Sequence, residues 1–194
     1  MQVDMPKLIV YHALYFRTMS QLQLRRILPA AHRYVKIKSR RSIVKALLQR
    51  VTEASVSVDG NIVGRIKCGL VALVGVGRGD TKADARQLAD KTSQLRIFAD
   101  DDGKFNLSAI DVKGEILVVS QFTLMACTAK GRRPSFTDAA PPPEAEKLID
   151  LYISYLKETG LMVKTGVFQA YMQVQIHNDG PVTIVLNSKD TRRK

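Results

Sequence analysis

The residue types that most often carry catalysis, histidine and cysteine, are few in the body of this chain. Hydrolysis by a serine or cysteine nucleophile needs a histidine close by, and residues 44–186 contain only His177. The alternation of 172–177 places His177 on the more polar face of a strand end, which favours a surface histidine over a general base. Cys68, Cys127 and His177 also lack the spacing of zinc ligands. If the chain is a hydrolase, we expect it to work without a conventional triad, a metal or another cofactor.

Two glycine-containing patterns invite a binding interpretation and fail on their spacing. GVGRGD at 75–80 is similar to a dinucleotide-binding loop, but Asp80 stands where the third glycine belongs. DDDG at 100–103 suggests a calcium loop, yet aligning its glycine with the obligatory one puts Phe98 and Ala109 at the first and last ligand positions. We therefore interpret 75–80 as a strand exit before a helix, and 100–103 as a hairpin turn.

Two other segments combine strand ends with special backbone residues. SQFTL at 120–124 is a polar interruption directly after a buried apolar run, and NDGPVT at 178–183 places glycine before proline between two strands. From the residues alone, a strand terminus and a turn remain the simpler explanation.

Hydrophobic periodicity supplies the elements that must position these segments. Helical spacing predicts one helix from a cap at Asp80-Thr81 to about Gln94, and another from Pro143 to Gly160. The segment 125–143 is irregular, and such a loop beside rigid strands is a common place for function. Alternation and continuous apolar runs predict strands at 44–51, 54–59, 61–66, 69–77, 95–98, 115–121, 162–167, 171–176 and 182–186.

The net charge of +12 in 194 residues points to a nucleic-acid partner, but most of it lies outside the body. Residues 1–43 hold nine Lys and Arg against one acid, residues 44–186 hold 17 against 16, and residues 187–194 hold four against one. We expect a basic N-terminal extension at 1–43, a single domain at 44–186 and a basic C-terminal tail at 187–194.

The extension and the cysteine content bear on where the protein works. Residues 1–43 are Arg-rich and acid-poor, which we interpret as a disordered arm or a start-site artefact, with organellar targeting as the alternative. No apolar run reaches the roughly 20 residues that cross a bilayer. Two cysteines form no disulfide framework, so a reducing, cytoplasmic location is expected.

Several strings, taken in order, resemble the D-aminoacyl-tRNA deacylase family. They are LLQRV (47–51), LVGVGRGDT (73–81), LRIF (95–98), SQFTL (120–124), GRRPSFTDAAPP (131–142) and NDGPVT (178–183). The resemblance covers 44–186, and Val44 stands where members of the family commonly begin with methionine. Together with the expected elements, it implies an α/β fold: a compact single domain of two packed β-sheets, barrel-like, with helices on one side.

The resemblance implies a proofreading hydrolase that cleaves the ester between a D-amino acid, or mischarged glycine, and the terminal adenosine of tRNA. Its substrates would be D-aminoacyl-tRNA and glycyl-tRNA(Ala). It also implies a homodimer with cross-subunit active sites, in which a cis Gly180-Pro181 peptide enters the partner's site. Main-chain atoms of that peptide would hold the α-amino group and leave no room for an L side chain. Neither a membrane nor DNA is expected as a partner.

An aminoacyl ester is already activated, so positioning and oxyanion stabilisation can suffice for its hydrolysis. The candidates for the oxyanion are main-chain N–H groups around 121–123. By the resemblance, Ser120 and Gln121 shape the pocket, and Phe122 forms a wall against the substrate. Thr123 has no basic partner in the sequence, so we assign it a supporting role, with a water molecule and the ribose 2′-OH as the reacting groups.

The remaining site residues also come from the resemblance. Arg50 would secure the Gly-Pro loop, with Asn178 in support, while Phe136 and Met172 match positions near the terminal adenine. Gln169 and His177 depart from the residues common in the family. The cations expected at tRNA phosphates, unless they form an ordinary solvated loop, are Lys130, Arg132 and Arg133.

Two other functions remain open from the sequence. A non-catalytic RNA-binding module would use the basic tails for affinity and the body as a scaffold. A deacylase acting on L-aminoacyl errors would consume the opposite enantiomer.

Overall fold

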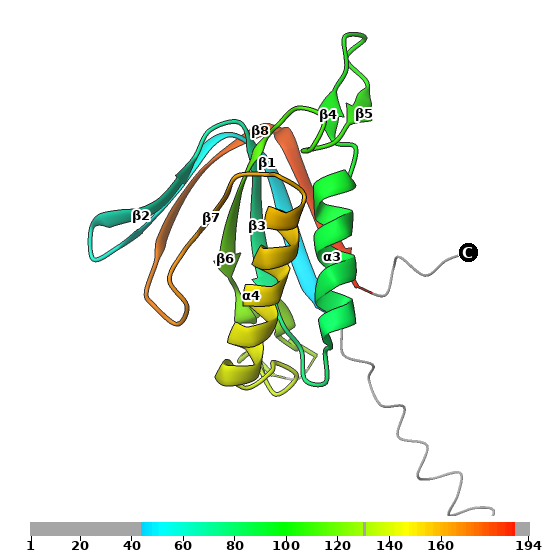
Figure 1. Cartoon of the computed structure of the whole chain (residues 1–194). Helices are drawn as coiled ribbons and strands as arrows, with labels where there is room; N and C mark the ends of the chain where they lie inside the picture. The colour runs from blue at the N-terminus through cyan, green and yellow to red at the C-terminus, as the bar shows by residue number, and fades with distance from the viewer. Residues whose placement is uncertain (1–43, 130, 189–194) are drawn as a thin grey trace, which may run out of the picture. The chain divides into compact units, whose positions relative to one another are not determined.

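The structure is a computed structural model that describes residues 44–129 and 131–188. These residues form a mixed α/β domain with a curved main sheet, a small second sheet and two helices (Figure 1). The expected fold class is confirmed. The extension at 1–43, Lys130 and the tail from 189 onward lie outside the described residues, so the division into extension, domain and tail stays a prediction.

The main sheet has six strands in the order β2-β1-β3-β6-β7, with β8 also paired to β1. β6 runs parallel to β3, and β7 parallel to β6, whereas β1 is antiparallel to all three of its partners. The strands are β1 (Lys45–Val58), β2 (Asn61–Ile66), β3 (Gly69–Gly75), β6 (Glu115–Ser120), β7 (Val163–Thr165) and β8 (Gln173–Asn187).

The sheet is nearly closed because its ends curl toward each other. The first half of β1 pairs with β3, its second half pairs with β2, and β8 follows it along both halves. A Cβ on Gly64 of β2 would lie 2.8 Å from the carbonyl oxygen of Thr165 on β7, so these two strands touch although they share no ladder. The curl encloses an apolar cluster that includes Val56, Ile66 and Leu117.

The predicted strands 44–51 and 54–59 are one continuous strand, and so are 171–176 and 182–186. The polar residues between them do not end the strands; they are accommodated as shifts of register between β1 and β8, on either side of Val51. A β-bulge lets a strand absorb extra residues without ending. Period-two patterning does not distinguish such a bulge from a turn.

Both helices pack on the face of the sheet opposite that cluster (Figure 1). Helix α3 (Lys82–Gln94) begins at Thr81, which forms a capping box with Asp84. Helix α4 (Pro142–Glu158) begins with prolines, whose fixed φ suits the first turn. Its fully buried Tyr152 donates a hydrogen bond of 2.9 Å to Thr92 Oγ1 of α3. The predicted starts and the end near Gln94 are therefore confirmed, with α4 starting one residue early.

The second sheet is a hairpin of β4 (Phe98–Ala99) and β5 (Phe105–Leu107), which projects beyond the C-terminal end of α3 (Figure 1). The strand predicted at 95–98 begins only at Phe98, because Leu95 caps α3 and the chain must first turn away from the helix. The predicted turn is present, and Asp100 accepts the N–H groups of Asp102 and Lys104. Among the described residues, no helix is long and apolar enough to span a bilayer.

Candidate active site

Residues 120–125 form a tight turn at the end of β6. The N–H of Gln121 makes the last ladder bond, 2.7 Å to the carbonyl of Val74, and a 3-10 helix, η1 (Phe122–Met125), follows. The first N–H groups of a helix have no partner within it. Those of Phe122 and Thr123 donate to no other described residue. The turn therefore presents two adjacent main-chain donors, those of Phe122 and Thr123, whereas the N–H of Gln121, which the expectation for 121–123 included, is used in the ladder.

The side chains of this turn are arranged around Thr123. Gln121 Nε2 donates to Thr123 Oγ1, so the amide orients the hydroxyl. Within the described residues no basic group contacts that hydroxyl, and Thr123 is exposed. Lys45 holds the turn from the other side, because its Nζ donates 3.1 Å to the carbonyl of Leu124. This anchoring by Lys45 was not predicted, since 79 residues separate the pair.

Phe122 and Phe136 are in contact, although the resemblance implies separate roles for them. Their ring centroids are 5.0 Å apart at 66°, an edge-to-face contact, and Phe122 is 59% exposed. The exposed ring of Phe122, backed by the half-buried ring of Phe136, is a surface on which a planar group can stack. Ser120 lies at the base of this surface as the last residue of β6.

The loop that carries Phe136 is fastened to the end of β3. Arg78 Nε donates 2.8 Å to the carbonyl of Thr137, and the N–H of Arg78 donates 2.9 Å to the carbonyl of Asp138. Arg132 and Arg133 are exposed in the same loop, as expected of phosphate-binding cations, whereas Lys130 lies outside the described residues. The fastening by Arg78 was not predicted.

Gly180 and Pro181 do not lie in a turn between strands, as the sequence suggested, but in a large bulge of β8. Gln49 pairs with Thr183 and Val51 with Asn178, so residues 179–182 all lie opposite the single residue Arg50. Asn178 closes the bulge, because its Oδ1 accepts the N–H of Val182 at 2.9 Å and its Nδ2 donates 3.0 Å to Thr183 Oγ1.

The backbone of this bulge has two special features. The Gly180–Pro181 peptide bond is cis, the isomer that the resemblance implies, and Gly180 has a φ of +121°. A Cβ at Gly180 would lie 2.8 Å from Val182 Cγ2 and 3.1 Å from Arg50 Nη2. Only glycine fits this position without displacing its neighbours.

Arg50 holds the bulge from the facing strand. Its side chain is 11% exposed, and its Nε lies 2.9 Å from Asp179 Oδ2, an ion-pair distance without a linear hydrogen bond. Its Nη1 donates 2.7 Å to the carbonyl of Ile97, and its guanidinium lies 5.3 Å from the ring centroid of Phe105. The contact with the Gly-Pro segment agrees with the expected role of Arg50. The contacts with the Ile97 carbonyl and the Phe105 ring were not predicted.

The two candidate segments do not meet within one chain. Ser120 is level with Val74 and Ala46 across the sheet, whereas the bulge is level with Arg50, four positions further along β1. At about 3.3 Å per residue, this separates them by about 13 Å along the strands alone. Met172 is also apart from Phe136: it packs with the enclosed cluster, against Gly166.

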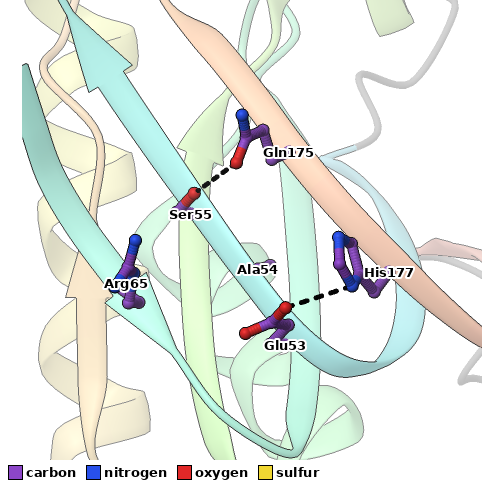
Figure 2. Close-up of a pocket in the computed structure, with 6 residues that line it drawn as sticks. All are labelled: Glu53, Ala54, Ser55, Arg65, Gln175 and His177. Carbon is purple, nitrogen blue, oxygen red and sulfur yellow. Dashed lines mark hydrogen bonds and ion pairs between the residues drawn. The ribbon is translucent and has the colours of Figure 1, made fainter. Parts of the chain in front are cut away.

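His177 lies in neither segment. Figure 2 shows it on the face of β8 beside β1, where its Nδ1 is 3.2 Å from Glu53 Oε1 and its side chain is 62% exposed. Together with Arg65 and Gln175 it lines a polar hollow of about 50 Å³. The described residues contain no cluster of three or more metal-ligating side chains. His177 is therefore a surface histidine, as its place in the alternation indicated.

Solved structures define the class of fold. One, named "Structural Analysis of a probable eukaryotic D-amino acid tRNA deacylase", matches with a TM-score of 0.66 over 75% of this chain and 99% of that chain, at 16% identity. Another, named "c-Myc DNA Unwinding Element Binding Protein", matches with a TM-score of 0.70 and 44% identity over 73% of this chain and 97% of that chain. The nearly closed sheet with two covering helices is the fold of these proteins.

The family follows from sequence similarity. The family model described as "D-Tyr-tRNA(Tyr) deacylase" matches residues 47–187. The D-aminoacyl-tRNA deacylase of Rhodopirellula baltica is 58% identical over 143 residues, 74% of this chain and 99% of the relative. That of Roseiflexus castenholzii is 57% identical over 145 residues, 75% of this chain and 92% of the relative. The chain belongs to the D-Tyr-tRNA(Tyr) deacylase family.

Proposed function

We propose that this chain hydrolyses the ester between a D-amino acid and the terminal adenosine of tRNA and spares the L form by means of Gly180-Pro181. Family membership supports the reaction, a hydrolysis of aminoacyl-tRNA. The observation that carries the selectivity is the bulge of β8, in which a residue without a side chain is pressed against Arg50. In this proposal the main-chain atoms of Gly180 and Pro181 contact the substrate, and they distinguish its handedness without distinguishing the identity of its side chain.

The turn after β6 supplies the chemistry in this proposal. The N–H groups of Phe122 and Thr123 donate to no described residue, so they are free to bind the oxygen that becomes negative when water attacks the ester carbonyl. Gln121 orients the Thr123 hydroxyl, which supports this arrangement without becoming a nucleophile. The attacking water is assisted by the 2′-OH of the terminal ribose.

A complete site in this proposal takes its parts from two chains. The α-amino group and the ester carbonyl of one substrate are only two bonds apart, whereas the bulge and the turn are separated by about 13 Å along the strands of one chain. A homodimer removes the conflict, because the Gly180-Pro181 bulge of one protomer then faces the turn of its partner.

The tRNA end is held by the residues around the turn. The edge-to-face pair of Phe122 and Phe136, in which Phe122 is exposed, offers a surface for the terminal adenine. Met172 is assigned a thioether contact to the same base, reached in the dimer. The cations assigned to the acceptor phosphates are Lys130, Arg132 and Arg133.

Two further properties follow from a site that excludes only an L side chain. Glycine has none, so glycyl-tRNA(Ala) is a second substrate. Because such editing serves translation, the cytoplasm is the proposed location, with residues 1–43 as a basic N-terminal extension.

The test is hydrolysis of D-tyrosyl-tRNA and L-tyrosyl-tRNA by the purified full chain, with glycyl-tRNA(Ala) as a third substrate. We expect the D ester and the glycyl ester to be cleaved and the L ester to remain. Preferential cleavage of the L ester would instead identify a deacylase of L-aminoacyl errors. Binding of tRNA with both tyrosyl esters left intact would identify an RNA-binding module.

A second test asks whether duplex DNA competes with tRNA for the protein. The structural relative that is 44% identical is named for binding a DNA element. In a competition assay, we expect duplex DNA to displace tRNA far less effectively than unlabelled tRNA does. Equal displacement would contradict the assignment of tRNA as the specific partner.

A further inference from the structure

The hairpin of β4 and β5 lies against Arg50 and takes no part in the function proposed above. Its Phe105 is 51% exposed and belongs to neither apolar cluster of the domain, so core packing does not account for a large ring at this position. Instead, the ring lies 5.3 Å from the guanidinium of Arg50. A cation at this distance from a ring centroid is attracted to the face of the ring.

The same hairpin also places the second partner of Arg50. The carbonyl of Ile97 accepts a 2.7 Å hydrogen bond from Arg50 Nη1, while the N–H of Ile97 donates 3.1 Å to the carbonyl of Leu107 on β5. Two contacts of the guanidinium therefore come from the hairpin and a third from Asp179, inside the bulge of β8. Arg50 lies between the hairpin and the bulge and contacts both.

The turn of the hairpin is itself well ordered by hydrogen bonds. Asp100 accepts from the N–H groups of Asp102 at 3.0 Å and Lys104 at 2.8 Å, and from the side-chain amide of Asn106. These bonds fix the path of the chain into β5 and thereby the position of Phe105. Phe98 and Leu107 anchor the hairpin in the helix-side core, whereas the ring of Phe105 lies outside both apolar clusters and contacts Arg50 instead.

We propose that the hairpin of β4 and β5 is a specificity-determining brace for the Gly180-Pro181 segment, with Phe105 as a positioning residue that acts through Arg50. The proposal rests on the proposed function, in which the segment rejects L substrates by occupying the space of their side chain. Such rejection depends on how firmly the wall is held, because a wall that moves admits the L side chain. Hydrolysis of the D form depends less on a firmly held Gly180-Pro181 segment, because the D side chain points away from it.

The kinetic test compares the ratio of single-turnover rate constants for D-tyrosyl-tRNA and L-tyrosyl-tRNA. We expect Phe105→Ala and Phe105→Leu to lower this ratio about two- to fivefold, the strength of an exposed cation–ring contact, mainly by faster cleavage of the L ester. Phe105→Tyr keeps a ring and should retain the wild-type ratio. Ile110→Ala is the matched control: Ile110 follows the hairpin, is 37% exposed and does not contact the guanidinium, so its removal should leave the ratio unchanged.

A double-mutant comparison shows whether Phe105 acts through Arg50. In an Arg50→Ala background, Phe105→Ala should have no further effect on the ratio. An unchanged ratio in Phe105→Ala alone would overturn the proposal. So would an effect that persists in full without Arg50.

A second measurement is independent of the reaction. In ¹⁵N relaxation experiments, Phe105→Ala should lower the order parameters of the Arg50 Nε–H and the Gly180 N–H, and Ile110→Ala should not. If the order parameters of both N–H groups are unchanged in Phe105→Ala, the proposal that the hairpin braces the bulge is wrong. If wild-type protein fails to prefer the D ester, the proposed function is lost, and the relaxation result still decides whether the hairpin braces the bulge.

Discussion

Replacing Gly180 by alanine tests the crowding in the β8 bulge. Gly180 has a φ of +121°, where a residue with a side chain is strained by about 1–3 kcal/mol. The added Cβ would also lie 2.8 Å from Val182 Cγ2 and 3.1 Å from Arg50 Nη2, so one of these groups must move. With about 1 kcal/mol for this overlap, we expect Gly180→Ala to lower the free energy of unfolding by about 2–4 kcal/mol.

Gly60→Ala is the control that separates strain from crowding. Gly60, in the turn between β1 and β2, also has a positive φ, +77°, but a Cβ there would meet nothing within 4 Å. Its cost is the backbone strain alone, about 1–2 kcal/mol. For equal backbone strain at the two positions, the difference between the variants is the overlap cost of about 1 kcal/mol, which reports the contact of the added methyl with Val182 and Arg50.

Urea unfolding of both variants at one protein concentration gives the stability difference, and the ratio of D to L deacylation gives its functional counterpart. Because the methyl pushes on Arg50, we expect the ratio to fall in Gly180→Ala and to stay at the wild-type value in Gly60→Ala. Equal losses of stability in the two variants, with equal D to L ratios, would refute the argument that Gly180 is required by its contact with Arg50.

Three other predictions concern the turn, the basic loop and the hairpin. Thr123→Ala should slow single-turnover deacylation by about 10- to 100-fold, whereas a loss near 10⁶-fold would indicate a nucleophile. Replacing Lys130, Arg132 and Arg133 together by alanine should reduce the slope of log Kd for tRNA against log salt by about two, at about 0.7 per cation, and an unchanged slope would remove them from the interface. Hydrogen bonds from Asn106, then from the Lys104 N–H, hold the pKa of Asp100 below its usual 3.8. Because this pKa is lower than in the unfolded chain, the ionised carboxylate stabilises the folded hairpin at neutral pH, and the contribution is lost as the pH falls below 3.8. An NMR titration of the Asp100 carboxyl with a midpoint at or above 3.8 would contradict the lowered pKa.

Local patterns predicted the elements whose boundaries are set by local chemistry. Thr81 caps α3 because its hydroxyl reaches the N–H of Asp84, three residues away, and prolines begin α4 because their φ is fixed. The strands were harder, since the breaks expected near 52–53 and 177–181 depend on what lies beside them. β1 and β8 pair on both sides of each irregularity, so the chain continues as strand where polar residues and Gly-Pro suggested a turn.

The candidate site divides in the same way. The free N–H groups after β6 follow from a strand end and a tight turn, which the sequence indicates. The environment of Arg50 does not, because Ile97 and Asp179 are 47 and 129 positions away in the chain. The contact between Phe122 and Phe136 depends on how Arg78 fastens the intervening loop, and a single sequence contains no local signal for it.

A site that recognises its substrate with main-chain atoms has a structural consequence. In the proposed function the recognising atoms belong to the backbone of Gly180 and Pro181, so a change of side chain at these positions would not adjust the fit. Adjustment must come from the residues that hold this backbone, and the bulge has two: Asn178, which closes it from within β8, and Arg50, which faces it from β1.

The positions of Asn178 and Arg50 are fixed by different parts of the fold. Asn178 acts within a few residues of the bulge, so its effect is local. Arg50 contacts Phe105 and the Ile97 carbonyl. In the proposed brace, its position therefore depends on the hairpin, a separate element of the fold. Substitutions at Asn178 should therefore affect stability and selectivity together, because they open the bulge itself. Substitution of the exposed Phe105 should change selectivity with little loss of stability, because it leaves both apolar clusters and the ladder between β1 and β8 intact.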